Sequence, residues 1–119
     1  MRSGKSSAYR RAVMGRLHQA MVETFDAPED GAFVTLMEYA EDQMGFGKSY
    51  LGIERSDDLL IVQITANNTR TVEQKKSLYK RIVELLGEDP GVRSEDIFIN
   101  LIDVPIENWS FGNGIAQYA

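Results

Sequence analysis

The sequence predicts a small α+β fold in which two helices cover one face of a β-sheet. Two segments carry apolar residues at helical spacing, and three shorter runs have the composition of β-strands. A helix followed by a strand occurs twice, in similar sequence. Such a duplicated unit is typical of a two-layer arrangement around one core.

Both predicted helices have clear start signals. The first begins at Ser6 or Ser7 and ends before Pro28, whereas the second begins at Thr71, with Gln74 as its capping-box partner. Gly87 is placed to end the second helix. The apolar stripe of the first helix consists of Tyr9, Val13, Leu17, Ala20, Met21 and Phe25, and that of the second of Val72, Leu78, Tyr79, Ile82, Val83 and Leu86.

Three strands are predicted, over residues 33–39 ("FVTLMEY"), 59–66 ("LLIVQITA") and 97–104 ("IFINLIDV"). The near-continuous apolar run of 59–66 predicts burial on both faces of the sheet. The strand over 97–104 is closed by Pro105, and we expect it to pair in parallel with 59–66 through the second helix.

The internal repeat predicts that one strand is missing. "SAYRRAV" at 7–13 parallels "SLYKRIV" at 77–83, and "FVTLME" from Phe33 parallels "FINLID" from Phe98. Only the second copy has an opening strand. The helix offset of 77 minus 7, or 70 residues, places the opening strand of the first copy at positions -11 to -4, before Met1. We therefore expect unpaired backbone that a partner subunit covers.

Length and composition narrow the class of protein. The 119 residues suit one domain spanning the whole chain, and the absence of cysteine excludes disulfides and thiolate zinc sites. A net charge of -5 disfavours partners such as nucleic acid or an anionic membrane. No apolar run suggests a membrane span or a signal peptide, so we expect a cytoplasmic protein.

Several other motifs carry weak signals. "GFGKS" at 45–49 lacks the first glycine of a phosphate-binding loop, and no cofactor is expected. His18 in the first helix is more often structural than catalytic. The long loop 40–58 contains a charge cluster that favours an ion-pair network over acid–base chemistry by Glu54. The cluster consists of Glu54, Arg55, Asp57 and Asp58, and a second, basic group of Arg2, Lys5, Arg10 and Arg11 predicts a solvated face or an anion-binding patch.

The chain ends in "ENWSFGNGIAQYA", which gathers Trp109, Phe111 and Tyr118. Chain ends usually fray, so three aromatic residues here indicate that the tail packs against something. Two interpretations stay open: a tail packed over its own core or a neighbouring subunit, and a tail that forms the wall of a pocket.

Three blocks, "LGIERSDDLLIVQIT", "RTVEQKKSLYKRI" and "ENWSFGNGIAQY", resemble the tautomerase superfamily, most closely its malonate semialdehyde decarboxylase-like branch. The resemblance extends over nearly the whole chain from Gly4. It implies a tautomerase-type β-α-β repeat, here with its first strand missing, and a homo-oligomer, with a trimer favoured. It also implies chemistry through an amino-terminal proline.

The resemblance carries three site residues onto this sequence. Arg70 is expected to hold the carboxylate of a small acid, while Trp109 and Phe111 supply apolar pocket wall. The position of a second family arginine is Asn68, and an acidic position aligns with Gly31, one residue after Asp30. No catalytic residue is assigned.

Met1-Arg2 stands where the resemblance implies a proline, and Gly4 lies about six residues nearer the chain start, or roughly 20 Å of extended chain. The favoured hypothesis is a tautomerase-superfamily protein without the catalytic proline, inactive or divergent, that binds a small carboxylate. The alternatives are an enzyme of this family with another base, and an assembly subunit that pairs with a proline-bearing relative.

Overall fold

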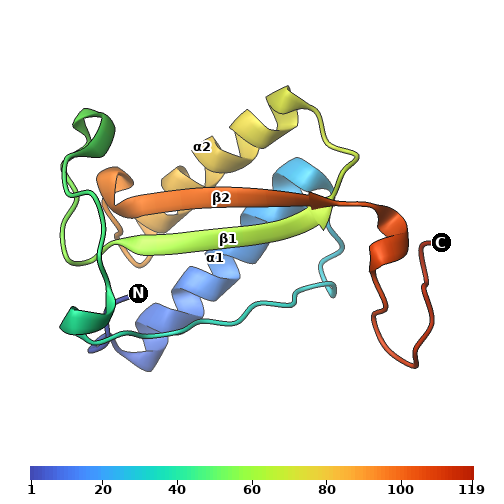
Figure 1. Ribbon diagram of the computed structural model, residues 1–119, viewed down its shortest axis with the longest axis horizontal. Helices are drawn as coiled ribbons and strands as arrows, with labels where there is room; N and C mark the ends of the chain where they lie inside the picture. The colour runs from blue at the N-terminus through green and yellow to red at the C-terminus, as the bar shows by residue number, and fades with distance from the viewer.

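The computed structural model describes residues 1–119 and has the predicted α+β architecture, with both helices behind a parallel sheet (Figure 1). The helices are α1 (Ser7–Phe25) and α2 (Val72–Glu88). The strands are β1 (Leu60–Asn67) and β2 (Ile97–Val104), which pair in parallel from Leu60 opposite Ile97 to Asn67 opposite Val104. No helix is long and apolar enough to span a membrane.

The helix starts follow the predicted caps. The Ser6 side chain accepts a hydrogen bond from the Tyr9 amide, and Thr71 and Gln74 form the capping box of α2. The predicted end at Gly87 is wrong. The helix continues to Glu88, because the Asp89 amide still donates to the Leu85 carbonyl at 3.1 Å.

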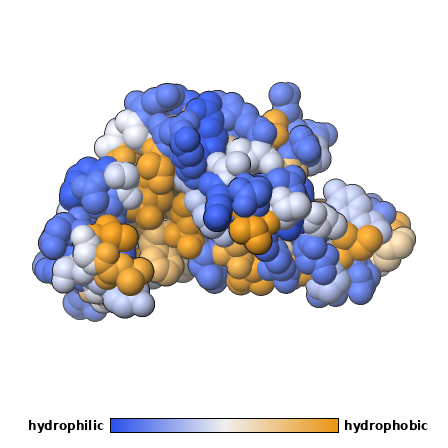
Figure 2. Space-filling model, turned by 90° about the horizontal axis from the view of Figure 1, so that it is seen from above, coloured by the Kyte–Doolittle hydropathy of each residue, from blue (hydrophilic) through white to orange (hydrophobic).

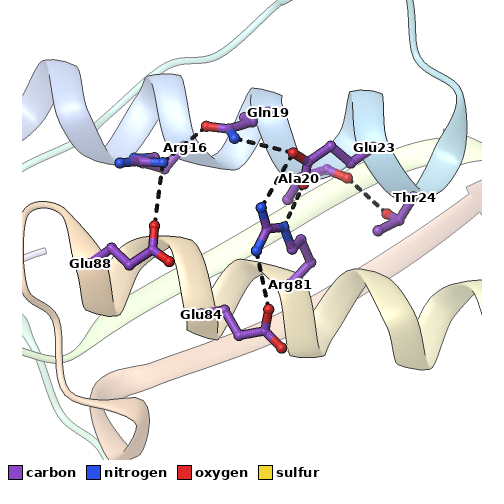
Figure 3. Close-up of polar contacts among 8 residues, drawn as sticks. All are labelled: Arg16, Gln19, Ala20, Glu23, Thr24, Arg81, Glu84 and Glu88. Atoms are coloured by element: carbon purple, nitrogen blue, oxygen red, sulfur yellow. Dashed lines mark hydrogen bonds and ion pairs between the residues drawn. The ribbon is translucent and has the colours of Figure 1, made fainter.

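The core lies between the two helices and the sheet. Apolar residues of α2 are almost fully buried there against Ala20 and Phe25 of α1. Figure 3 shows polar contacts along the rim of the helix pair, where Arg81 of α2 reaches Glu23 of α1. Exposed ion pairs contribute little to stability, so apolar packing dominates this contact. The buried α2 residues are Leu78, Ile82, Leu85 and Leu86.

The segment predicted as a strand over 33–39 is not a strand. It is an extended stretch that follows the sheet at a distance (Figure 1), and only Tyr39 forms a β-bridge, with Arg2. None of the amides of residues 32–38 donates a hydrogen bond within the chain. The sequence pattern suits a strand, but a strand also needs a neighbour, and this segment has none along most of its length.

The end of the expected opening strand is present in the chain. The Met1 amine donates to the Met37 carbonyl at 2.9 Å, the Tyr39 amide donates to the Met1 carbonyl at 2.8 Å, and the Ser3 amide donates to the Tyr39 carbonyl at 2.9 Å. This bridge runs parallel, like the pairing of β1 and β2. The expectation that the whole strand lies at -11 to -4 is therefore corrected, because residues 1–3 occupy its last positions.

The prediction that 59–66 is buried on both faces is wrong for a single chain. Alternate residues such as Leu60 and Val62 are buried under the helices, whereas Ile61 is 56% exposed. The opposite face has no covering layer, so apolar side chains remain at the surface there. Seen from above in Figure 2, the surface shows apolar patches between polar ones. The exposed apolar residues on this face of the sheet and on the extended segment are Phe33, Val34, Met37, Ile61, Phe98 and Ile102.

The overall shape is more extended than the length requires. The Cα radius of gyration is 15.3 Å, against about 13.5 Å expected for a compact domain of this size. The open sheet face and the projecting loop and tail (Figure 1) account for the difference.

Candidate functional site

A groove of about 670 Å³ separates the extended segment 32–37 from β1. Its lining is mainly apolar and includes Val13, Leu17 and Met21 from α1. Residues 1–3 pair only with one end of the extended segment, at residues 37–39, and no strand lies between the rest of the segment and β1. The groove follows the length of β1, which is roughly 23 Å for eight residues.

Arg70 lines one end of the groove, just after β1 and before the cap of α2. Its Nη2 donates to the Phe25 carbonyl at 2.6 Å, and the guanidinium carbon lies 4.9 Å from the centroid of the Phe25 ring. These two contacts fix the half-buried side chain.

The charge of Arg70 is not compensated. No salt bridge involves Arg70, and it is the only lysine or arginine among the groove-lining residues, which include no aspartate or glutamate. A guanidinium carries five N–H donors, and only Phe25 and, at 3.4 Å, Thr69 accept from this one. Arg70 therefore retains donors that suit a carboxylate.

The carboxyl-terminal tail closes the same end of the groove. Trp109 stacks on Phe111 with ring centroids 5.4 Å apart, and Phe111 also contacts Phe33 at 6.1 Å and Tyr118 at 5.1 Å. The Trp109 indole Nε1 donates to Asn67 Oδ1 at 2.6 Å, which ties the tail to the end of β1. The two interpretations of the tail thus coincide, because it packs on its own chain and lines the groove. Ligand contact by Trp109 and Phe111 stays a prediction.

The Met1 amine lies at the other end. The Met1 side chain is buried, and the Met1 amine donates to the Met37 carbonyl. Burial lowers the pKa of this amine. Salt bridges from Arg2 to Asp57 and from Lys5 to Asp58 hold the chain start near the beginning of β1. Arg70 follows the end of β1, so the length of the strand, roughly 23 Å, separates the amine from it. Hydrogen-bond reach for proton transfer is about 3 Å.

The charge cluster of loop 40–58 does not form an ion-pair network within itself, because its two aspartates pair with the amino-terminal residues and Arg55 bonds to backbone carbonyls. Arg55 donates to the carbonyls of Gly47, Tyr50 and Ile53, which orders the loop. Asp57 and Asp58 pair with Arg2 and Lys5, and Arg10 pairs with Glu38. The basic amino-terminal residues are thereby largely neutralised, apart from Arg11.

Of the remaining residues that the sequence suggested for the site, only some line the groove. Gly31 and His18 line the groove, and the His18 ring contacts the Glu29 carbonyl at 2.8 Å, whereas Asp30 and Asn68 do not line it. The Glu54 carboxylate forms no ion pair, and only its backbone carbonyl is engaged, by Arg93 at 3.2 Å. No group of three or more His, Cys, Asp or Glu side chains could hold a metal ion.

Nothing in the sequence indicated the role of two residues, one that positions Arg70 and one that attaches loop 40–58 to the sheet. Phe25 was expected only in the apolar stripe of the helix, but its carbonyl and ring hold Arg70. Asp96 is 1% exposed and accepts from the Ser56 amide at 2.7 Å and hydroxyl at 2.6 Å, which fastens loop 40–58 to the start of β2. Both contacts join residues 40 or more apart, so no local motif marks them.

Comparisons with known proteins agree on one family. A family profile described as "Tautomerase enzyme" matches residues 31–112, and a second profile with the same description matches residues 1–53. The probable tautomerase YusQ of Bacillus subtilis (strain 168) is 39% identical over 117 residues, which cover 98% of this chain and 92% of YusQ. The probable tautomerase YrdN of the same organism is 27% identical, over 97% of this chain and 88% of YrdN.

Solved structures show the same similarity. A malonate semialdehyde decarboxylase superposes with a TM-score of 0.91 at 26% identity, over 99% of this chain and 91% of that protein. A second malonate semialdehyde decarboxylase, FG41, inhibited by 3-bromopropiolate, superposes with a TM-score of 0.90 at 32% identity, over 98% of this chain and 88% of that protein. A fused 4-OT symmetric trimer has the same fold, with a TM-score of 0.78 at 24% identity over 99% of this chain and 93% of that one.

The bond between Asn67 and Trp109 gives a test of the groove wall. Exchanging Asn67 for alanine removes the acceptor of the only indole in the chain, and a hydrogen bond of this kind contributes about 1 kcal/mol. We expect Trp109 emission to shift to longer wavelength and acrylamide quenching to increase. Asn68→Ala is the matched control, because the Asn68 side chain makes no hydrogen bond. Unchanged emission and quenching in Asn67→Ala would contradict the docked tail.

Proposed function

Because this chain belongs to the tautomerase family, we propose that it binds a small organic acid at the Arg70 end of the groove. The observation that carries the proposal is an oriented arginine without an acidic partner in a mainly apolar groove. A guanidinium binds a carboxylate through two parallel hydrogen bonds. The low polarity of the surroundings strengthens this attraction relative to water.

The aromatic wall is proposed to select for a short acid. Trp109 and Phe111 stack on each other beside Arg70 and leave an apolar surface for the rest of the ligand. Two solved relatives are named malonate semialdehyde decarboxylases, and that name specifies a three-carbon acid with an aldehyde group. We therefore favour short 3-oxo acids as the ligand class.

Exchange of Arg70 tests the proposal directly. Malonate is a stable probe with the required carboxylate. Arg70→Ala should weaken its binding by about 1.5–3 kcal/mol, or roughly 10- to 150-fold, because a charge-assisted hydrogen bond is lost. Isothermal titration calorimetry measures the change.

Arg11→Ala is the matched control for this titration. Arg11 is an exposed residue of α1 that forms no salt bridge and does not line the groove. Its exchange removes the same charge and should leave malonate affinity unchanged. Equal affinity for Arg70→Ala and the parent chain would reject the role of Arg70.

We further propose that the 119-residue chain binds such acids without efficient proline-type turnover. The support is the separation between the Met1 amine and Arg70, together with the absence of a carboxylate from the groove lining. Proton NMR of the chain with malonate semialdehyde should show no accelerated decarboxylation or hydration. Robust turnover at a rate that depends on Arg70 would overturn this part of the proposal and leave acid binding intact.

A homo-oligomer, with a trimer favoured, is proposed to cover the open face of the sheet. The support is the exposed apolar residues Ile61, Phe98 and Ile102 and the trimers described for fused 4-OT. Phe98→Glu places a charge on that face and should lower the mass measured by light scattering at micromolar concentration. Ser77→Glu, on the exposed surface of α2, is the control. A monomeric mass for the parent chain would contradict the oligomer.

A further inference from the structure

We propose that Asn67 determines specificity at the Arg70 site, because its side-chain amide donates a hydrogen bond to a second oxygen of the acid whose carboxylate Arg70 binds. The preferred ligands are then short acids with a carbonyl oxygen, such as 3-oxo acids, over the same acids without that oxygen. This inference rests on the proposed acid binding at Arg70. It adds a residue that recognises a particular polar group, whereas the aromatic wall offers apolar surface.

The hydrogen bond to Trp109 determines which end of the Asn67 amide is free. The Trp109 indole Nε1 donates to Asn67 Oδ1 at 2.6 Å. An indole N–H can only donate, so the amide cannot turn over without placing its own NH₂ group against that donor. The NH₂ group of Asn67 is therefore held on the other side of the amide, away from the indole.

The Asn67 NH₂ group is unpaired and accessible. The bond to Trp109 is the only hydrogen bond of the Asn67 side chain. Among residues that are not exposed, Arg2 Nε is the only buried side-chain polar atom without a partner, so Asn67 Nδ2 is not sealed from solvent. Asn67 is half-buried and lines the groove, as Arg70 does. A ligand in the groove can therefore accept from the two N–H donors of this amide.

Asn67 and Arg70 are neighbours that are held by separate contacts. Three residues of chain separate their Cα atoms by at most about 11 Å. Asn67 is paired opposite Val104 in the sheet, whereas the Arg70 guanidinium donates to the Phe25 carbonyl of α1. The charged guanidinium suits the carboxylate of the ligand, and the neutral amide suits a neutral carbonyl oxygen. Together they can bind the two oxygen groups of one short acid.

The test compares acetoacetate with butyrate, which has the same carbon chain but no 3-oxo group. Calorimetry of the full chain should show about fivefold tighter binding of acetoacetate, the effect of one hydrogen bond to a neutral oxygen. If neither acid binds, acid binding at Arg70 is rejected and this inference with it. Equal affinities for the two acids, both lost in Arg70→Ala, would overturn the role of Asn67 alone.

Asn67→Asp keeps an oxygen for the indole but replaces the amide donor with a second oxygen. The added negative charge should weaken both acids, and the preference for acetoacetate should disappear, because only acetoacetate uses the donor. Unchanged Trp109 emission checks that the tail stays docked. Asn68→Asp is the matched control, since it adds the same charge at a residue that does not line the groove, and it should keep the preference. A fivefold preference that survives in Asn67→Asp would overturn the proposal.

A measurement on the parent chain does not depend on how the variants fold. In ¹⁵N-resolved NMR, the side-chain NH₂ resonances of Asn67 should shift during titration with acetoacetate but not with butyrate. The guanidinium resonances of Arg70 should shift with both acids. Shifts of the same size for Asn67 with the two acids, or with neither, would contradict a hydrogen bond from Asn67 to the oxo group.

Discussion

An extended backbone segment needs a neighbouring strand to satisfy its hydrogen-bonding groups, and this constraint determines most of the structure. Residues 1–3 pair with residues 37–39, but no strand continues this pairing along the rest of the segment 32–38. β1 pairs with β2 on one side only. The groove between these two walls is the direct result, and its length, its apolar lining and its free backbone groups follow from the same interrupted sheet.

The interrupted sheet also separates the two charged groups of the groove. Arg70 is held on Phe25 and beside the aromatic tail at one end, and the Met1 amine is held on Met37 at the other. Neither has an acidic partner among the groove-lining residues. The chain thus offers two cationic positions joined by an apolar channel.

The sequence was sufficient to predict elements whose signals are local. Ser6 and the Thr71–Gln74 pair mark helix starts through short-range hydrogen bonds, and the apolar runs mark β1 and β2. The strand over 33–39 failed because its composition suits a strand, whereas the missing neighbour was indicated only by the internal repeat. Arg70 was identified through resemblance alone. Its contact with Phe25 could not be predicted from the sequence, because it joins residues 45 positions apart.

Amide hydrogen exchange measured by NMR tests the interrupted sheet most directly. The amides of residues 33–36 should exchange orders of magnitude faster than those of residues 99–101 in β2, because only the latter lie in a paired strand. Covering the open face of the sheet would not change this result, since strand amides point within the plane of the sheet. Similar protection of both segments would show that residues 33–36 form a paired strand and would contradict the account.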